Sequence, residues 1–438
     1  MVYYTHKNLD SYEEEFMPRG IEKNTYFPYY FILGYCLFIS IIAFIIDSPK
    51  DIIIGLKKII LESDILITDY IELSGIGASF INSSLVITSL IVLLFILKVK
   101  PNGAILAGLF TTAGFSLLGK NIINIWPIVI GIFLYSKFKN LSFTNFIVII
   151  LFGTTLSPTV GELFFSDFLP ISLSIIISLS ISIFLGFILV PMASYTLKLH
   201  QGYSLSNVGL AGGLIGTGLT SIFRAFGLEP EKKLLWSTGN NTFLFLILLF
   251  LFISMILIGY FSDKKCLKNL SAMHNHSGRL ISDYYSMFGQ SLTFINMGVL
   301  GIFATIFVII VGGDLNGATI SGIFTVSGFG AFGKHIKNII PIIIGATISA
   351  LLNIWDITSP GMILGILFST ALSPIAGHFG WFYGVLAGFL HICMVMNIGY
   401  LHGGMNLYHN GFAAGFVAMI LVPIITAFRK EQEFNEPY

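Results

Sequence analysis

The chain has 438 residues, of which 55% are hydrophobic and only 10% are charged, and its formal net charge is +1. A soluble domain carries about 25% charged residues, so this composition excludes a water-soluble fold. It predicts an all-α polytopic membrane protein, and the small net charge gives no electrostatic basis for a nucleic acid partner.

In the first half of the chain, several apolar stretches are long enough to cross a bilayer, which takes about 20 helical residues. The pattern predicts a polar tail over 1–26, spans at 27–47, 78–98, 121–138, 143–157 and 169–196, an amphipathic interfacial segment at 51–74 and a glycine-rich element at 204–227. Residues 103–118 would form a helix only about 24 Å long at the usual rise. We therefore expect a short or re-entrant helix there.

The second half repeats the first. Residues 102–131 and 316–345 share 17 of 30 positions at a shift of 214. Shorter matches extend the repeat on both sides. Asp69-Tyr70 matches Asp283-Tyr284 at the same shift of 214. Leu156-Ser157-Pro158 matches Leu372-Ser373-Pro374 at a shift of 216, and His200 matches His402 at a shift of 202. The pattern predicts two homologous repeats, 27–227 and 241–428, joined by a linker at 228–240 and followed by a polar tail at 429–438.

Internal repeats in a membrane protein are typical of transporters and channels, whose sites lie near the midplane on broken helices. Each repeat holds five clear spans and one or two short elements. We therefore expect about 10–12 transmembrane segments in all. An odd number of crossings per repeat would invert the second repeat relative to the first, and this is the arrangement that we favour.

On a helix over 103–119, Gly108, Thr111, Phe115 and Gly119 fall near one face. The glycines favour close helix packing. The hydroxyl groups of Thr111 and its counterpart Thr325 could bond their own helix backbone or a permeating solute.

Lys120 and Lys334 each follow a glycine inside apolar sequence, and each shares a predicted helix face with an asparagine four residues later, Asn124 and Asn338 respectively. A lysine in hydrocarbon costs on the order of 3 kcal/mol, so its side chain should face protein or water. Three interpretations stay open: the ammonium group reaches the membrane surface, caps helix carbonyls, or attracts an anion to a path.

Several histidines also lie in apolar surroundings, among them His200, His402, His335, His391 and His409. A neutral imidazole both donates and accepts, so it could move protons or bind a polar solute. The alternative for each is an ordinary hydrogen bond between helices.

Two further pairs are candidates. Glu162 has His378 at its equivalent position in the second repeat, and the two could meet across a pseudo-twofold axis. Asn82 and Asn296 each stand near the start of a span, where an amide either caps the helix or points at a solute.

No enzyme signature is found. Gly-x-Ser-x-Gly, a phosphate-binding loop and His-Glu-x-x-His are all absent from the sequence. The three cysteines, Cys36, Cys266 and Cys393, are too far apart in sequence to suggest a disulfide framework or a metal site. We therefore expect no catalytic activity, no cofactor and no metal.

The motif Gly-Phe-Gly-Ala-Phe-Gly-Lys-His at 328–335, with Asn338 and Pro341, resembles a family of uncharacterised, duplicated polytopic bacterial membrane proteins, a domain of unknown function. The order of Phe80-x-Asn82, Asn102-Gly103 and Ser157-Pro158 more loosely resembles the plan of urea transporters. That likeness implies two opposed halves, short re-entrant helices and a central polar pore in each protomer of a homo-oligomer. It implies nothing about the solute, because the motifs match poorly.

These observations favour a multi-pass transporter or channel of the cell (plasma) membrane for a small hydrophilic solute, with a small anion first and a urea-like amide second. A membrane enzyme acting on a lipid, and a sensor or scaffold subunit, are the rival classes. The expected partners are the bilayer and the solute. The expected path residues are Lys120, Lys334, Thr111, Thr325, Asn124, Asn338, Asn82, Asn296, Asn102, Asn316, Glu162, His378, His335, His200 and His402.

Overall fold

A computed structural model describes residues 25–62, 68–164, 170–229, 234–352 and 355–428, and the regular elements of these ranges are helices. The first repeat comprises α2 (Phe27–Ile46), α3 (Pro49–Leu61), α4 (Tyr70–Ser74), α5 (Ile76–Ile96), α6 (Gly103–Phe115), α7 (Trp126–Phe138), η2 (Phe143–Phe146), α8 (Ile147–Gly153), η3 (Thr154–Leu156), α9 (Pro158–Phe164), α10 (Ile171–Leu199) and α11 (Asn207–Ala225). The second comprises α12 (Asn241–Ser262), η4 (Lys264–Asn269), α13 (Leu270–Asn275), α14 (Tyr284–Ile310), α15 (Gly317–Gly328), η5 (Phe329–Ala331), α16 (Ile336–Leu352), α17 (Pro360–Ser369), η6 (Thr370–Leu372), α18 (Ser373–Phe379), α19 (Trp381–Ile398), η7 (Gly399–His402) and α20 (His409–Phe428).

Ten helical stretches of the described residues are long and apolar enough to cross a membrane, five in each repeat. This confirms an all-helical, multi-pass protein built from two repeats. The segment expected at the interface over 51–74 is two helices, α3 and α4, and the side chain of Tyr70 at the start of α4 is fully buried. The predicted polar tails lie outside the described ranges, apart from residues 25 and 26.

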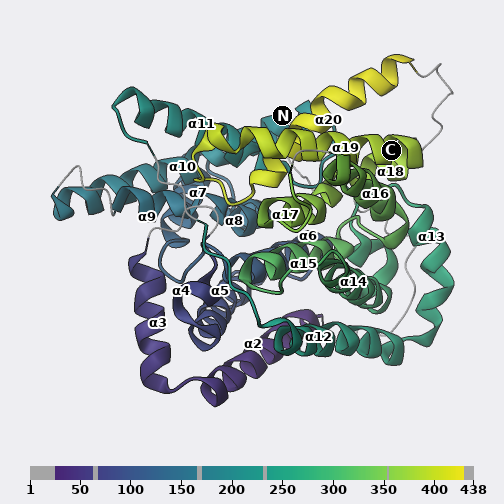
Figure 1. Cartoon of the computed structure of the whole chain (residues 1–438), viewed down its shortest axis with the longest axis horizontal. Coiled ribbons are helices and arrows are strands. Elements are labelled where there is room, and N and C mark those ends of the chain that lie inside the picture. The colour runs from purple at the N-terminus through teal and green to yellow at the C-terminus, as the bar shows by residue number, and fades with distance from the viewer. Residues whose placement is uncertain (1–24, 63–67, 165–169, 230–233, 353–354, 429–438) are drawn as a thin grey trace.

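The centre of the molecule is the contact between α6 and its counterpart α15, with α2 and α12 on one side and α11 and α20 on the other (Figure 1). A Cβ atom on Gly114 would lie 2.6 Å from the Cα atom of Ser321, and one on Gly328 would lie 3.3 Å from the Cα atom of Ala107. Since these are one contact made twice in reversed order, the two equivalent helices run antiparallel. A pseudo-twofold axis passes between them, which agrees with the predicted inversion.

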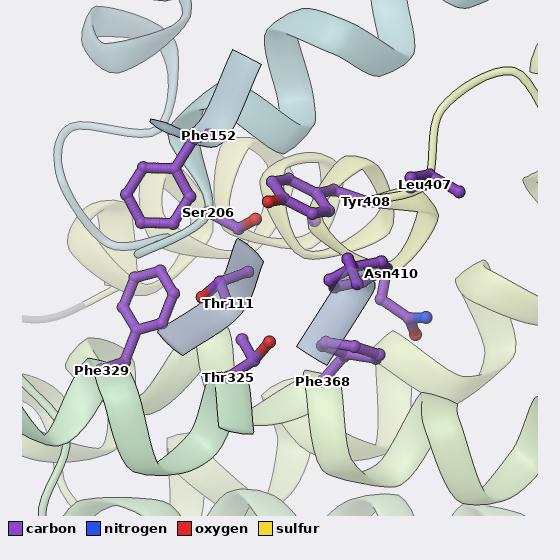
Figure 2. Close-up of a pocket in the computed structure, with 11 residues that line it drawn as sticks. Thr111, Phe152, Ser206, Thr325, Phe329, Phe368, Leu407, Tyr408 and Asn410 are labelled. Carbon is purple, nitrogen blue, oxygen red and sulfur yellow. The ribbon is translucent and has the colours of Figure 1, made fainter. Parts of the chain in front are cut away.

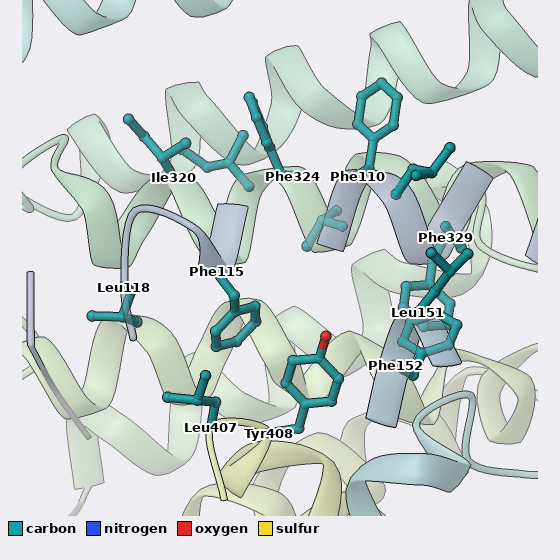
Figure 3. Packing of buried hydrophobic residues seen from close by; sticks show 14 of the residues in the cluster. Phe110, Phe115, Leu118, Leu151, Phe152, Ile320, Phe324, Phe329, Leu407 and Tyr408 are labelled. Carbon is teal, nitrogen blue, oxygen red and sulfur yellow. The ribbon is translucent and has the colours of Figure 1, made fainter. Parts of the chain in front are cut away.

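Aromatic rings mark the same axis. The rings of Phe110 and its counterpart Phe324 lie 5.9 Å apart on one side of the α6–α15 pair, and Phe115, Phe152 and Tyr408 lie on the other (Figure 3). The first side is closed by apolar packing. The second side, where hydroxyl groups join the rings, is the one with space for a polar molecule.

Substituting Gly114 by alanine is expected to lower the apparent melting temperature of the purified protein, because the added methyl group meets backbone of α15 and overpacking costs about 1–3 kcal/mol. The matched control is Gly218→Ala in α11, where a Cβ meets nothing within 4 Å. The control should be neutral, or stabilising by up to about 1 kcal/mol. Equal melting temperatures for both variants would contradict the close approach of α6 and α15.

Candidate functional site

The two short central helices, α6 and α15, are called half-helices below. At the first residue of each, the backbone N–H donates to a carboxylate from the other repeat. Asp283 Oδ1 accepts the N–H of Gly103 at the start of α6 (3.0 Å), and Asp69 Oδ1 accepts the N–H of Gly317 at the start of α15 (3.1 Å). The side chain of Asp69 is fully buried, and it also accepts from Ile71 (3.0 Å). Burial raises the pKa of Asp69, and its hydrogen bonds oppose that shift. The carboxylates therefore tie the two repeats together at the positive ends of both half-helices.

Asn102 and Asn316 also accept backbone N–H groups at the starts of α6 and α15. Asn102 Oδ1 accepts from Ile105 N (2.9 Å), and Asn316 Oδ1 accepts from Thr319 N (3.0 Å). Both are N-caps, so their carbonyl groups are used by the backbone. Neither lines the central cavity described below.

Asn82 and Asn296 hold the opposite ends of the half-helices. Asn82 Nδ2 donates to the carbonyl oxygens of Ser116 (2.7 Å) and Lys120 (2.9 Å), and Asn296 makes the two equivalent bonds at 2.8 Å each. The interpretation of this pair as helix caps is wrong, because Gly75 is the N-cap of α5 and Asp283 that of α14. The amides instead satisfy carbonyls that the broken helices leave without intrahelical partners.

Asn124 and Asn338 close the turns that follow. Asn124 Oδ1 accepts from Asn121 N (2.9 Å) and its Nδ2 donates to Gly119 O (3.1 Å), and Asn338 makes the equivalent two bonds at 2.9 Å. Gly119 sits at φ 91°, a conformation that favours glycine. The helical face predicted for residues 120 and 124 is wrong, because the chain is irregular between α6 and α7.

Lys120 and Lys334 do not reach a membrane surface. Their side chains are 0% and 1% exposed. Lys120 Nζ donates to the hydroxyl of Tyr408 (2.7 Å), and Lys334 Nζ donates to Thr370 Oγ1 (2.8 Å). Each ammonium group also lies over an aromatic ring, 4.7 Å from the centroid of Tyr408 and 4.9 Å from that of Phe329. The rings of Tyr408 and Phe329 therefore lie between the two lysines and the centre of the molecule.

A small cavity of about 20 Å³ lies at the pseudo-twofold axis between the repeats, large enough for one water molecule (Figure 2). Most of its lining comes in equivalent pairs. The lining residues are Thr111 with Thr325, Phe115 with Phe329, Phe152 with Phe368, Ser206 with Tyr408, and also Leu407, Asn410 and Gly411.

Two aromatic pairs flank this cavity. The rings of Phe152 and Phe329 lie 5.5 Å apart at 38°, and those of Phe115 and Phe368 lie 5.7 Å apart at 31°. The pseudo-twofold axis exchanges one pair for the other. Figure 2 shows Phe152 and Phe329 on one side, Phe368 on the other, and the two threonines between them.

The threonine hydroxyl groups are the polar centre of the cavity. Thr325 Oγ1 donates to the Ser321 carbonyl one helical turn earlier (2.7 Å), whereas Thr111 Oγ1 is buried and has no hydrogen-bond partner among the described residues. A buried hydroxyl without a partner costs about 1–3 kcal/mol. A polar molecule bound here would recover that energy.

The cavity departs from symmetry at one point. Tyr408 stands where the first repeat has Ser206, and its ring packs 4.8 Å from that of Phe115. Its backbone N–H donates to Thr155 Oγ1 (2.8 Å), which joins this wall to the first repeat. A large side chain tied to Lys120 thus fills one half of the space, and a small one borders the other.

The remaining predicted residues lie elsewhere. His335 Nε2 is 3.0 Å from the His276 carbonyl oxygen, and the ring of His378 lies 5.5 Å from that of Tyr203. Neither these two histidines nor Glu162 lines the cavity. His200 and His402 occupy equivalent positions outside the lining, as described further below. In the part of the chain that the structure describes, no group of three or more His, Cys, Asp or Glu side chains could hold a metal ion.

Of the matched polar pairs, the structure brings only Thr111 and Thr325 to the cavity. Sequence reasoning missed the aromatic pairs, although Phe152 and Phe368 do match at the shift of 216. It also missed Tyr408, whose signal was a difference between the repeats rather than an identity.

The chain matches none of the curated proteins and none of the solved structures with which it was compared. A family model does match, over residues 48–225 and again over residues 262–427, so the two matches follow the two repeats. They cover well over half of the chain, which therefore belongs to the family described as Protein of unknown function (DUF1576).

Proposed function

We propose that this protein is a transporter or channel of the plasma membrane, rather than an enzyme, and that a small hydrophilic solute passes through the cavity between its repeats. The observation that carries the proposal is the position of that cavity. It lies on the pseudo-twofold axis of two repeats, at the ends of short broken helices, where solute sites of duplicated transporters are found. Its matched hydroxyl groups and aromatic pairs supply hydrogen bonds and flat walls.

The lining favours a neutral solute over an anion. It offers hydroxyl groups, one amide and aromatic faces, and no lysine or carboxylate contributes to it. Lys120 and Lys334 are hydrogen-bonded behind the rings. A small, flat molecule with several hydrogen-bonding groups, such as a simple amide, fits between two aromatic pairs with threonines at its edges. A small anion comes second, since it would have to draw on Lys120 through the Tyr408 hydroxyl.

At about 20 Å³ the cavity is smaller than such a solute, so this arrangement is a closed one. The side chains that close it are rings, namely Phe115, Phe152, Phe329, Phe368 and Tyr408. A path opens only if these rings move, in a channel as in an alternating-access transporter.

Purified protein in sealed liposomes should speed the passage of a radiolabelled small amide, and nitrate more weakly. Replacing both Thr111 and Thr325 with valine is expected to cut the amide flux about tenfold, because two hydrogen bonds to the solute are lost at roughly 0.5–1.5 kcal/mol each. The control is Thr305→Val in α14, a buried threonine that only bonds its own helix at Gly301 (2.8 Å). Liposomes no more permeable than empty ones to either solute would overturn the proposal.

A further inference from the structure

The equivalent histidines His200 and His402 bond to different side chains in the two repeats, an asparagine in the first and a histidine in the second. In the first repeat, the ring of His200 bonds to Asn207 Oδ1 (3.0 Å), and Asn207 Nδ2 donates to the Ala193 carbonyl (2.9 Å). The other ring nitrogen of His200 accepts from the backbone N–H of Ser204 (3.4 Å). The amide of Asn207 therefore links His200 to the α10 backbone, and an amide does not titrate. Both ring nitrogens of His200 have hydrogen-bond partners.

In the second repeat, His409 takes the place of Asn207 at the shift of 202. His409 Nε2 lies 2.9 Å from the Val395 carbonyl, the counterpart of Ala193, and His409 Nδ1 lies 2.7 Å from His402 Nε2. A carbonyl only accepts, so His409 Nε2 carries the hydrogen and His409 Nδ1 is an acceptor. His402 Nε2 must then be the donor of the second bond.

This assignment leaves a free base inside the protein. With its hydrogen on Nε2, neutral His402 has a lone pair on Nδ1, and that atom is buried with no hydrogen-bond partner among the described residues. The side chain of His402 is 0% exposed. The first repeat avoids this situation, since Ser204 N–H fills the equivalent position.

The pair is adjacent to the cavity wall. His409 lies in sequence between Tyr408 and Asn410, and both of these neighbours line the cavity. Asn410 Oδ1 is also 3.3 Å from His391 Nε2, and His391 Nδ1 is a second buried ring nitrogen with no partner among the described residues. A change at the pair therefore acts on residues that border the proposed path.

We propose that His402 and His409 form a proton-binding site, present only in the second repeat, that couples solute movement through the cavity to protons. The coupling rests on the proposed transport function, whereas the site itself does not. A proton adds to the lone pair of His402 Nδ1, no other bond breaks, and the charge is shared across the bond to His409. The protonated Nδ1 then needs an acceptor that this arrangement lacks, so protonation favours a different placement of the segment 402–411.

Among the described residues of the elements packed against the pair, few other side chains are charged. On α11, Arg224 lies over the ring of Tyr400 (3.7 Å to the centroid) and pairs with Glu229 at 2.7 Å. The titratable groups of α19 are Tyr383, His391 and Cys393. The helices α17 and η6 carry no titratable side chain. With Arg224 paired to Glu229, the imidazoles of His391, His402 and His409 are the remaining groups there that can gain a proton.

The site can be tested without transport. In protein with ¹⁵N-labelled histidine, the imidazole signals of His402 and His409 should titrate together as the pH is lowered from about 8 to about 4. The signal of His200, braced by Asn207, should stay neutral over that range. The variant His409→Asn copies the first repeat and should fold, and in it His402 should no longer titrate. If His402 and His409 stay neutral throughout, the site is overturned.

The coupling is tested by flux in the same liposomes. The wild type should change its amide flux about fivefold or more between the two ends of that pH range, which is an ordinary size for coupling between two sites. His409→Asn should remove this dependence, and His274→Asn on α13, the matched control, should keep it. Flux that is equally pH-dependent in wild type and His409→Asn overturns the coupling. Titration without any flux supports the site and overturns transport instead.

Discussion

Replacing Asp69 with alanine is expected to lower the free energy of unfolding by about 3 kcal/mol or more, since three backbone N–H groups lose their acceptor at roughly 1–3 kcal/mol each. The donors are Ile71 (3.0 Å), Gly317 (3.1 Å) and Ser237 (3.0 Å). Ile71 belongs to the first repeat, Gly317 to the second and Ser237 to the linker between them, so the substitution should loosen the interface between the repeats. Denaturant titration of the purified protein in detergent measures the effect.

Two variants calibrate this result. Asp69→Asn should lie between wild type and alanine, because the amide keeps Oδ1 but turns an N–H group toward the donor of Ser237. Asp283→Ala should cost less than Asp69→Ala, because Asp283 is only partly buried and its Oδ1 serves Gly103 and Ser286. If Asp69→Ala were as stable as wild type, α15 would not depend on a carboxylate from the other repeat.

The reason for such a large effect lies in where the half-helices begin. α6 and α15 start inside the protein, where water cannot satisfy their first N–H groups. The space there is also tight, since a Cβ atom on Gly317 would overlap both Asp69 Oδ1 and the Leu117 carbonyl oxygen. Removing the carboxylate thus leaves a polar gap that a neighbouring side chain cannot enter without shifting backbone.

Most of the fold could be predicted from the sequence, because apolar length and a repeated pattern are properties of the chain itself. The two repeats and the short central helices followed from matches such as Gly114 with Gly328. The irregular break after each short helix was not predicted, because Lys120 and Asn124 have the spacing of a helix face. The burial of Tyr70, at the end of the segment expected at the interface, was not predicted, because it depends on neighbours in space. Periodicity within 51–74 carries no record of those neighbours.

The candidate site was harder, since identity between repeats marks an equal environment and not a path. The asparagine pairs match because broken helices expose carbonyls that every copy must satisfy, as Asn82 does for Ser116. A matched hydroxyl such as Thr111 looks the same in sequence whether it faces a cavity or its own helix. The two proposals rest largely on positions that differ between the repeats, Ser206 with Tyr408 and Asn207 with His409.

Removing the ring of Tyr408 is the substitution with the largest effect expected on transport. Serine at this position copies Ser206 and would open the filled half of the cavity. It would also remove the 2.7 Å hydrogen bond from Lys120 Nζ to the Tyr408 hydroxyl, and a buried donor that loses its partner costs about 1–3 kcal/mol. Lys120→Met must therefore accompany it.

The informative comparison is between the double variants Lys120→Met/Tyr408→Ser and Lys120→Met/Tyr408→Phe, which differ at position 408 in the presence of a ring. The serine variant should carry the amide about tenfold faster, a difference that corresponds to about 1.4 kcal/mol in the barrier. The phenylalanine variant keeps the ring against Phe115 and should stay near the wild-type rate. Equal flux in the two would mean that the ring of Tyr408 does not obstruct the path, and that the solute crosses somewhere other than between the two aromatic pairs.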